Sequence, residues 1–328
     1  MNTTVYRNGN TSRLKGLAVA VIGYGNQGAA HALNLRDSGV RVIVGQRPGA
    51  AFDRAREAGF SPVPAGEAAA QADLVILALP DETAGDVYAA EIAPALRPGA
   101  ALGFIHGFNI HFGFITPRGD GDVVLVGPKG PGSLLRSLYL EDRGLPALAA
   151  VAHDASGRAF DLALAWAAAI GCTRAGVLRT TFAEETETDL FGEQAVLCGG
   201  VSALTQAAFE TLVDAGYSPE SAYLECVHEL KQIADLIYAQ GLAGMRARIS
   251  NTAEYGDRTR GPRIIGEPAR AEMRRVLAEI RDGTFAREWI NEARRGAPIL
   301  ARGRREDREA CFERVGAFVR SLMPWLAG

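Results

Sequence analysis

The stretch Leu17–Gly39 reads LAVAVIGYGNQGAAHALNLRDSG and decides the fold class. Its first six residues form an apolar run typical of a buried strand, and Gln27–Ser38 has the pattern of an amphipathic helix. The first glycine of a GxGxxG motif permits a tight turn, the second lets a pyrophosphate approach the backbone, and the third lets helix and strand pack closely. We therefore predict a dinucleotide-binding turn, with an ordinary strand–helix turn as the alternative. The motif is Gly23-Tyr24-Gly25-Asn26-Gln27-Gly28.

The rest of the first half repeats this alternation of strand and helix. Ala-rich helical segments separate the apolar runs, such as Ala84–Leu96, which stops before Pro98-Gly99. Such alternation is typical of parallel βαβ units with helices on both faces of one sheet. The predicted strands are Leu17–Ile22, Arg41–Val44, Leu74–Leu79, Ala101–Ile105, Val123–Val126, Ala147–Val151 and Ala175–Leu178, and a further helix is predicted at Phe160–Ile170.

The second half of the chain changes to long helical patterns. Ser218-Pro219-Glu220 is a favourable helix start, with an N-cap serine, proline at the first helical position and an acid in the first turn. Apolar residues then recur with helical spacing to about residue 240. We therefore predict a doubly wound parallel α/β domain over residues 1–181 and an all-helical domain over residues 182–328. Other predicted helices are Pro268–Arg281, Phe285–Arg295 and Glu306–Leu322.

The composition argues against several classes of protein. The 328 residues carry 35 Lys and Arg against 38 Asp and Glu, a net charge of −3, whereas nucleic-acid-binding proteins usually have a basic excess. Four scattered cysteines without a CxxC pair suit a reducing compartment. The most apolar stretch, Leu162–Ile170, has nine residues, fewer than the about 20 that span a bilayer. We expect a cytoplasmic protein with no nucleic-acid and no membrane partner.

Carboxylates gather at two places in the predicted helical domain. Five acids and no basic residue lie between Glu184 and Glu193. Asp189 and Glu193 are four residues apart, hence on one face of a helix, and Glu225 and Glu229 repeat this spacing on the next long helix. Two such pairs could form an oxygen-rich site for a hard cation such as magnesium. The alternative is that both pairs lie on solvated acidic faces.

Several polar groups follow predicted strands, where a doubly wound sheet has its ligand crevice. His106 could be a catalytic or substrate-orienting group, or a hydrogen-bonded loop histidine. Lys129 lies in a Gly/Pro-rich loop that could also be a plain turn. Arg47 stands near the position of the acid that binds the NAD ribose, so it could pair with a 2′-phosphate or lie in solvent. Ser250–Asp257 is predicted as a polar loop that could bind a carboxylate or cap a helix.

Together these segments resemble ketol-acid reductoisomerase, the acetohydroxy-acid isomeroreductase of valine and isoleucine biosynthesis, in its short-chain form. The matching motifs are long, ordered and spread over nearly the whole chain. They are GYGNQGAAHALNLRDSG (Gly23–Gly39), LPDE (Leu79–Glu82), HGFNIHF (His106–Phe112), GPKGPG (Gly127–Gly132), DASG (Asp154–Gly157), ETETDLFGEQAVLCGG (Glu185–Gly200) and ISNTAEYGD (Ile249–Asp257).

The resemblance implies a Rossmann domain and a helical domain entwined as a knot between two subunits, and so a homodimer with shared active sites or a higher oligomer built from such dimers. It implies two steps at one site. Two magnesium ions promote alkyl migration in 2-acetolactate or 2-aceto-2-hydroxybutyrate, and NADPH or NADH then reduces the keto acid to a 2,3-dihydroxy-3-methyl acid. A two-metal clamp suits the migration, because alkoxide character develops between adjacent oxygenated carbons.

The resemblance also implies roles for individual residues. His106, Lys129 and Glu229 match catalytic positions, and Ser250 matches a contact to the substrate carboxylate. The implied magnesium ligands are Asp189, Glu193, Glu225 and Glu229. The implied cofactor contacts are Gly23, Tyr24, Gly25, Asn26, Gln27, Gly28, Arg47, Asp81, Glu82, Thr83, Ala84 and Gly132.

One departure from the family pattern concerns the choice of cofactor. The phosphate-binding loop usually carries serines after the arginine, and here Ala50, Ala51 and Phe52 take their places. Asp53 would repel a 2′-phosphate if it pointed inward. We therefore predict relaxed or NADH-leaning specificity.

Other functions are compatible with parts of the pattern. A hydroxyacid-type dehydrogenase shares the two-domain plan and works by general acid–base catalysis without paired metal carboxylates. A cofactor-binding sensor of the same fold would need neither the four carboxylates nor His106 and Lys129. A third alternative is a homologue from a specialised pathway that acts on a different 2-keto-3-hydroxy acid or acetohydroxy acid.

Overall fold

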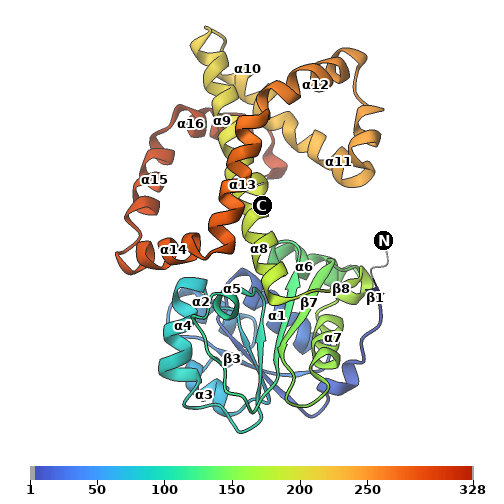
Figure 1. Cartoon of the computed structure of the whole chain (residues 1–328), viewed down its shortest axis with the longest axis vertical. Coiled ribbons are helices and arrows are strands. Elements are labelled where there is room, and N and C mark those ends of the chain that lie inside the picture. Colours follow the sequence, from blue (N-terminus) through green and yellow to red (C-terminus); the bar gives the residue numbers. More distant parts are fainter. Residues whose placement is uncertain (1–3, 327–328) are drawn as a thin grey trace. The chain divides into compact units, whose positions relative to one another are not determined.

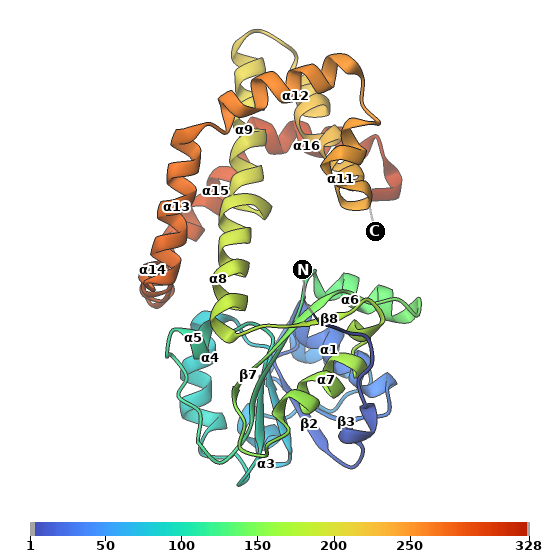
Figure 2. The same ribbon diagram turned by 45° about the vertical axis from the view of Figure 1, so that its right-hand side comes forward.

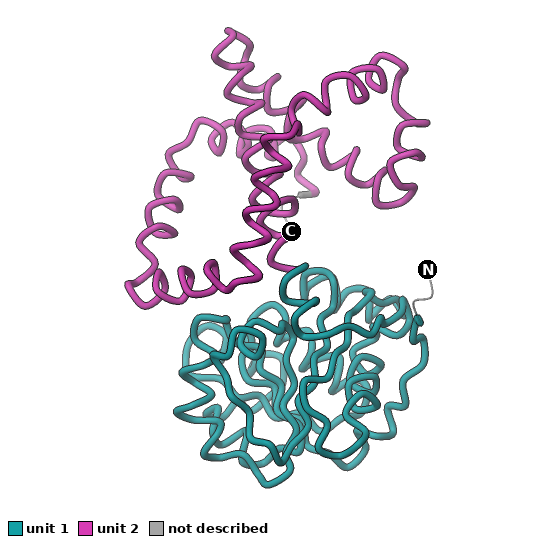
Figure 3. The backbone as a smooth tube through the Cα atoms, in the orientation of Figure 1, with its two compact units in different colours: residues 1–188 teal, residues 189–328 magenta. Residues whose placement is uncertain are grey.

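The computed structural model of the chain describes residues 4–326. It contains two compact units, unit 1 (Met1–Thr188) and unit 2 (Asp189–Gly328), which Figure 3 shows in two colours. The domain boundary predicted from the sequence, between residues 181 and 182, coincides with the start of helix α8 (Phe182–Gly192). This helix begins in unit 1 and continues into unit 2.

Unit 1 is built on one eight-stranded sheet in the order β1-β8-β7-β6-β5-β4-β2-β3, with helices on both faces (Figures 1 and 2). The strands are β1 (Val5–Tyr6), β2 (Ala18–Ile22), β3 (Arg41–Gly45), β4 (Leu74–Leu77), β5 (Ala101–Phe104), β6 (Val123–Pro128), β7 (Ala147–His153) and β8 (Val177–Arg179). The helices before α8 are α1 (Asn26–Asp37), α2 (Ala50–Glu57), α3 (Ala65–Ala70), α4 (Asp81–Val87), α5 (Phe108–His111), α6 (Gly132–Leu140) and α7 (Ala159–Ala169). Two 3₁₀ turns, Thr11–Leu14 and Cys172–Arg174, and a π-helix, Tyr88–Ile92, complete the unit.

The central strands bury side chains on both faces of the sheet. In β2, Val19 and Val21 belong to the core formed with α1 and α7, whereas Ala20 and Ile22 belong to the core formed with α3 and α4. Every residue of β2, β4, β5 and β6 is buried. Strands covered on both faces are near-continuous apolar runs rather than alternating ones. This is why apolar runs located seven of the eight strands.

Five of the seven strand pairings are parallel, as predicted, and two at one side of the sheet are antiparallel. β7 starts at Ala147 opposite Pro128, the last residue of β6, so the chain re-enters the sheet at the edge it has just left. The intervening α6 packs along α1 and does not carry the chain back to the opposite edge. The two-residue strand β1 pairs with β8 and is too short to give a sequence pattern.

Unit 2 consists of helices. They are α9 (Gly199–Asp214), α10 (Pro219–Tyr223), α11 (Glu229–Arg246), α12 (Asn251–Ile264), α13 (Glu267–Arg281), α14 (Thr284–Arg294), α15 (Pro298–Glu309) and α16 (Cys311–Ser321), with a 3₁₀ turn at Pro324–Leu326. Two π-helices, Glu193–Leu197 and Leu224–His228, join α8 to α9 and α10 to α11. A small core of Phe209, Ala222, Tyr223 and Val319 holds α9, α10 and α16 together.

Three details of unit 2 differ from the sequence prediction. The helix predicted over Glu306–Leu322 is two helices, because Ala310 is extended (ψ 141°). The predicted loop Ser250–Asp257 is helical from Asn251 onward, with Ser250 as its N-cap. The helix predicted from Ser218 contains a π-helical turn, although its end near residue 240 is confirmed by the non-helical Gly241 (φ 70°).

One helical run, Phe182–Asp214, is long and apolar enough to cross a membrane by length and composition alone. It lies outside the most apolar stretch of the sequence, Leu162–Ile170, from which we predicted no membrane span. The run starts with the five acids of Glu184–Glu193, and charged groups are costly inside a bilayer. Only 6% of its most apolar window is buried within this chain. Three of its large apolar side chains, Val196, Leu197 and Leu204, are exposed in this chain.

Candidate active site

The GxGxxG turn joins β2 to α1 in the conformation that its glycines predict. Gly23 has a φ of 100°, and its N–H donates to Gly45 O at 2.8 Å. A Cβ atom on Gly28 would lie 2.1 Å from Gly23 O, so only glycine fits where the helix meets the strand. At Gly25 nothing lies within 4 Å of such an atom, and no side chain caps α1. An open glycine beside uncapped helix N–H groups fits the pyrophosphate of a dinucleotide.

The loop after β3 supports this turn and leads into α2. Gln46 Oε1 accepts the Tyr24 N–H at 2.9 Å, so the side chain at the position of the missing acid is engaged with the nucleotide loop itself. Arg47 is exposed. α2 starts at Ala50, and no side chain caps its N-terminus. The first turn of α2 therefore presents N–H groups without the hydroxyls that would help to hold a 2′-phosphate.

Hydrogen bonds join the nucleotide-binding turn Gly23–Gly28 to the Gly/Pro-rich loop Gly127–Gly132. Gln27 Nε2 donates to Gly130 O at 2.9 Å, and Ser133 N–H donates to Asn26 Oδ1 at 2.8 Å. A Cβ atom on Gly132 would lie 2.2 Å from Asn26 O, so the backbones of the two loops are in direct contact. The loop that carries Lys129 is therefore more than a plain turn, because the nucleotide loop fixes its position.

Glu185, on the first turn of α8, connects the ends of β5 and β6. Its Oε1 lies 2.7 Å from Lys129 Nζ, and its Oε2 accepts the Gly107 N–H at 2.9 Å and lies 3.2 Å from His106 Nδ1. The side chain is only 1% exposed. A Cβ atom on Gly127 would lie 2.9 Å from Glu185 Oε1, and one on Gly107 would lie 2.3 Å from an α8 hydroxyl, so glycines at both strand ends let α8 approach.

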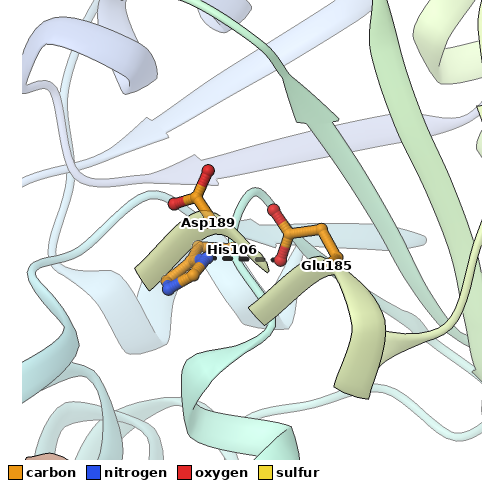
Figure 4. A group of neighbouring side chains, drawn as sticks. All are labelled: His106, Glu185 and Asp189. Atoms are coloured by element: carbon orange, nitrogen blue, oxygen red, sulfur yellow. Dashed lines mark hydrogen bonds and ion pairs between the residues drawn. The ribbon is translucent and has the colours of Figure 1, made fainter. Parts of the chain in front are cut away.

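The charge of Glu185 is stabilised where it is buried. Burial raises the pKa of this carboxyl, but hydrogen bonding and the charges of His106 and Lys129 outweigh burial and hold the pKa below its usual range. Glu185 is therefore ionised at neutral pH. It orients both His106 and Lys129, and Figure 4 shows the second ring nitrogen of His106 pointing away from it.

His106, Glu185 and Asp189 form a group whose potential metal ligand atoms all lie within 4.8 Å of one another (Figure 4). Asp189 is one turn after Glu185 on the continuous helix α8, and this spacing accounts for its place beside His106. Both oxygens of Glu185 already face N–H or ammonium donors. Asp189 is therefore the member of the group best suited to a hard cation.

The four predicted magnesium ligands do not meet in a single chain. Among residues 4–326, no three of them have oxygen atoms within 4.8 Å of one another. Glu193 begins one π-helix, and Glu225 and Glu229 lie in and directly after the other. Four residues turn either kind of helix through nearly a full circle, so each pair still shares a face, and π-helical turns are common at functional sites. The side chains of Glu193, Glu225 and Glu229 are exposed.

Ser250, the predicted substrate contact, has a structural role in this chain. Its Oγ accepts the Ala253 N–H at 3.1 Å and so caps α12. Of the two alternatives drawn from the sequence, capping is observed. A serine hydroxyl that accepts this bond still has its own hydrogen to donate, so the structure is compatible with a contact to a carboxylate.

Sequence reasoning did not assign Glu185 a role, although it counted it among the acids before Glu193. A signal was present in the spacing, because Glu185 and Asp189 are four residues apart and share a helix face. What the spacing could not show is that this face meets two strand ends. That depends on the close approach of α8 at Gly107 and Gly127.

Comparison with known proteins gives a consistent picture along the chain. Residues 13–176 match the model of the acetohydroxy acid isomeroreductase NADPH-binding domain, and residues 182–325 match that of the ketol-acid reductoisomerase C-terminal domain. A solved structure of an NADH-preferring ketol-acid reductoisomerase from an uncultured archaeon is 44% identical, with a TM-score of 0.95 over 98% of this chain and 99% of that one. A semialdehyde dehydrogenase NAD-binding protein from Cupriavidus necator is 22% identical, with a TM-score of 0.63 over 81% of this chain and 99% of that one, and shows likeness of fold alone.

Proposed function

This chain belongs to the ketol-acid reductoisomerase family, and on that basis we propose how its residues carry out the reaction. It is an NAD(P)H-dependent oxidoreductase of branched-chain amino-acid biosynthesis. The substrate that we propose is 2-acetolactate or its ethyl homologue 2-aceto-2-hydroxybutyrate. An alkyl shift converts it to a keto acid, which is reduced to the 2,3-dihydroxy-3-methyl acid. The observation that carries the assignment of roles is the buried Glu185, which joins His106 to Lys129 one turn before Asp189.

We propose that Asp189, Glu193, Glu225 and Glu229 bind two magnesium ions. Hard cations prefer carboxylate oxygens, and the two pairs offer four carboxylates on two helix faces. When bound, the ions would polarise the hydroxyl and carbonyl of the substrate. Since the pairs do not meet in one chain, we propose that each site combines carboxylates from two chains.

His106 and Lys129 then act on the substrate from unit 1. Glu185 orients the His106 ring through Nδ1, so that the other ring nitrogen is directed to hold or move a proton at the substrate oxygens. The Lys129 ammonium, held by Glu185, places positive charge where alkoxide character develops. Ser250 is proposed to bind the substrate carboxylate.

The proposed cofactor contacts are the glycine turn after β2, the segment Asp81–Ala84 and Gly132. We propose relaxed or NADH-leaning specificity. Support comes from the α2 N-terminus, where Ala50, Ala51 and Phe52 offer no hydroxyl and Asp53 lies in the first turn. The 44% identical neighbour is NADH-preferring, which is in line with this proposal. A ratio of catalytic efficiencies above about 100-fold in favour of NADPH, nearly 3 kcal/mol, would contradict it.

We also propose a cytoplasmic homodimer with no nucleic-acid or membrane partner. The four cysteines are free, which suits a reducing compartment. The exposed apolar side chains of unit 2, such as Leu204 and Leu242, would be covered by the second copy. Association of this kind would also bury the apolar run Phe182–Asp214 without a bilayer.

One assay separates this function from its alternatives. NADH and NADPH oxidation would be followed separately with acetolactate, with and without magnesium. We expect turnover that requires magnesium and that Glu229→Gln abolishes, while Glu220→Gln, an exposed acid outside the site, leaves it unchanged. Turnover that persists in EDTA would indicate a metal-independent dehydrogenase. Normal NADH binding without turnover would indicate a sensor or a different acetohydroxy acid substrate.

A further inference from the structure

Asn109 has no role in the reaction described above, yet its side chain connects two parts of the proposed site. It lies on α5, three residues after His106, and is 3% exposed. Its Nδ2 donates to Asp81 O at 3.1 Å, and its backbone O accepts the Ile115 N–H at 2.9 Å. The side chain therefore joins the segment after β5 to the first residue of α4, which follows β4.

The two segments approach each other closely at Gly85. A Cβ atom on Gly85 of α4 would lie 3.1 Å from Phe114 O and 3.6 Å from Asn109 Oδ1. Glycine at position 85 lets α4 approach the α5 segment this closely. The Asn109 amide forms a side-chain hydrogen bond between the segment Asp81–Ala84 and the segment that carries His106.

The carbonyl oxygen of the Asn109 side chain has no such bond. This atom, Oδ1, is buried and accepts no hydrogen bond within residues 4–326. A buried acceptor without a partner destabilises a folded protein. Stability alone therefore does not explain an asparagine at this position. The atom that is hydrogen-bonded, Nδ2, faces the cofactor-binding segment.

We propose that Asn109 is a positioning residue that fixes Asp81–Ala84, and with it the bound cofactor, relative to His106. The inference rests on the proposed function of both segments. Hydride transfer requires the nicotinamide and the substrate carbonyl to be held at near-contact distance, so a shift of one loop against the other slows it. Asn109 acts through the backbone of Asp81 and does not itself need to touch the cofactor.

Asn34 provides a matched control in the same unit. It is fully buried on α1, and its Nδ2 also donates to a backbone carbonyl, that of Ile170, at 3.2 Å. Unlike in Asn109, both polar atoms of the Asn34 side chain are hydrogen-bonded, because Oδ1 accepts a hydrogen bond from Arg136 Nη1 at 2.8 Å. Neither of these contacts involves the loops at the carboxyl ends of β4 and β5.

The test compares Asn109→Ser with Asn34→Ser in the full-length protein. NADH affinity is measured by fluorescence titration without substrate or magnesium, and stability by the urea midpoint. We expect Asn109→Ser to weaken NADH binding by about 5- to 10-fold, the size of one lost hydrogen bond, with little change in midpoint. We expect Asn34→Ser to lower the midpoint and leave NADH affinity within about 2-fold of the wild type.

A second readout is turnover of the keto acid intermediate supplied directly, which isolates the reduction. Asn109→Ser should lower its kcat, whereas Asn34→Ser should not. NADH affinity within about 2-fold of wild type in Asn109→Ser, or losses that follow the urea midpoint in both variants, would overturn the proposal. Failure of the proposed function is separate: a wild type that binds NADH without converting acetolactate would refute that function, while weakened NADH binding in Asn109→Ser would still support the positioning role.

Discussion

The two units bury their apolar side chains to very different degrees. In unit 1 the central strands are buried along their whole length between two helical layers. In unit 2 the cluster of Phe209, Ala222, Tyr223 and Val319 is a small core shared by α9, α10 and α16. Of the large apolar side chains exposed among residues 4–326, three lie in unit 1 and sixteen in unit 2. Large exposed apolar surfaces mark interaction sites.

The two units also differ in how their candidate site residues are arranged. Unit 1 holds His106, Lys129 and Glu185 in defined contacts within one chain. Unit 2 carries Glu193, Glu225 and Glu229 exposed and not gathered. We infer that the contacts among His106, Lys129 and Glu185 need only one chain. The carboxylates of unit 2, in contrast, form a metal site only when a second copy covers them.

The largest effect is expected from Glu185→Gln, which tests whether unit 1 organises its residues alone. The variant keeps the shape but removes the charge that holds Lys129 and orients His106. We expect kcat to fall by about 100-fold, with oligomeric state and NADH affinity unchanged. The control is Glu184→Gln, because Glu184 is exposed and its carboxylate accepts a hydrogen bond from Thr180 Oγ1 on the chain surface. An equal loss in both variants would show that the effect is not specific to the buried carboxylate.

A smaller effect, on assembly, is expected from a charge placed on the apolar surface of unit 2. Leu204 on α9 is 46% exposed in the chain, and Leu140 on α6 of unit 1 is 65% exposed. If a second copy covers unit 2, Leu204→Glu buries a charge and should weaken association by at least about 10-fold in analytical ultracentrifugation. Leu140→Glu should leave association unchanged although Leu140 is the more exposed. If the two variants weakened association equally, or if neither did, the inference that a second copy covers unit 2 and not unit 1 would be wrong.

The smallest effect near neutral pH is a loss of unit 1 stability, which grows as the pH falls. His31 is fully buried and accepts a hydrogen bond from Trp166 Nε1 at 3.1 Å, and burial lowers its pKa from 6.5 to about 3. Below pH 6.5 the unfolded chain binds a proton that the folded His31 does not. Stability should therefore fall from about pH 6.5 toward pH 3, by up to about 1.4 kcal/mol per pH unit.

Urea unfolding followed by fluorescence would measure this dependence, with Trp289 and Trp325 replaced by phenylalanine so that Trp166 is the one tryptophan left. His31→Gln should reduce the slope below pH 6.5, because glutamine can accept the Trp166 N–H without titrating in this range. An unchanged slope in His31→Gln would mean that other groups determine the acid sensitivity of unit 1.

Unit 1 could be predicted from its sequence in more detail than unit 2. Strands β2 to β8 coincide with apolar runs because both faces of the sheet are covered, and the glycines of Gly23–Gly28 specify their own turn. The antiparallel entry of β7 could not be predicted, since apolar runs do not give strand direction. In unit 2 the break at Ala310 has no proline or glycine to signal it.

Some residues of the candidate site could likewise be predicted from the sequence, whereas the roles of others depend on packing. His106 and Lys129 could be nominated because they follow strands, and the carboxylate pairs because they share helix faces. The role of Glu185 depends on the packing of α8 against two strand ends, and that of Asn109 on the packing of α4 against α5. Neither contact leaves a periodic signal in the sequence.

The central claim is that carboxylates of two chains form one metal site, and subunit complementation tests it most directly. Asp189→Asn and Glu229→Gln chains, each inactive alone, would be coexpressed with different tags. If one pair comes from each chain, every mixed dimer contains one intact site and one doubly altered site. The coexpressed protein should then recover about a quarter of wild-type specific activity, given random pairing. If all four carboxylates of a site come from one chain, every site carries an alteration, and activity no higher than that of the single variants would contradict the claim.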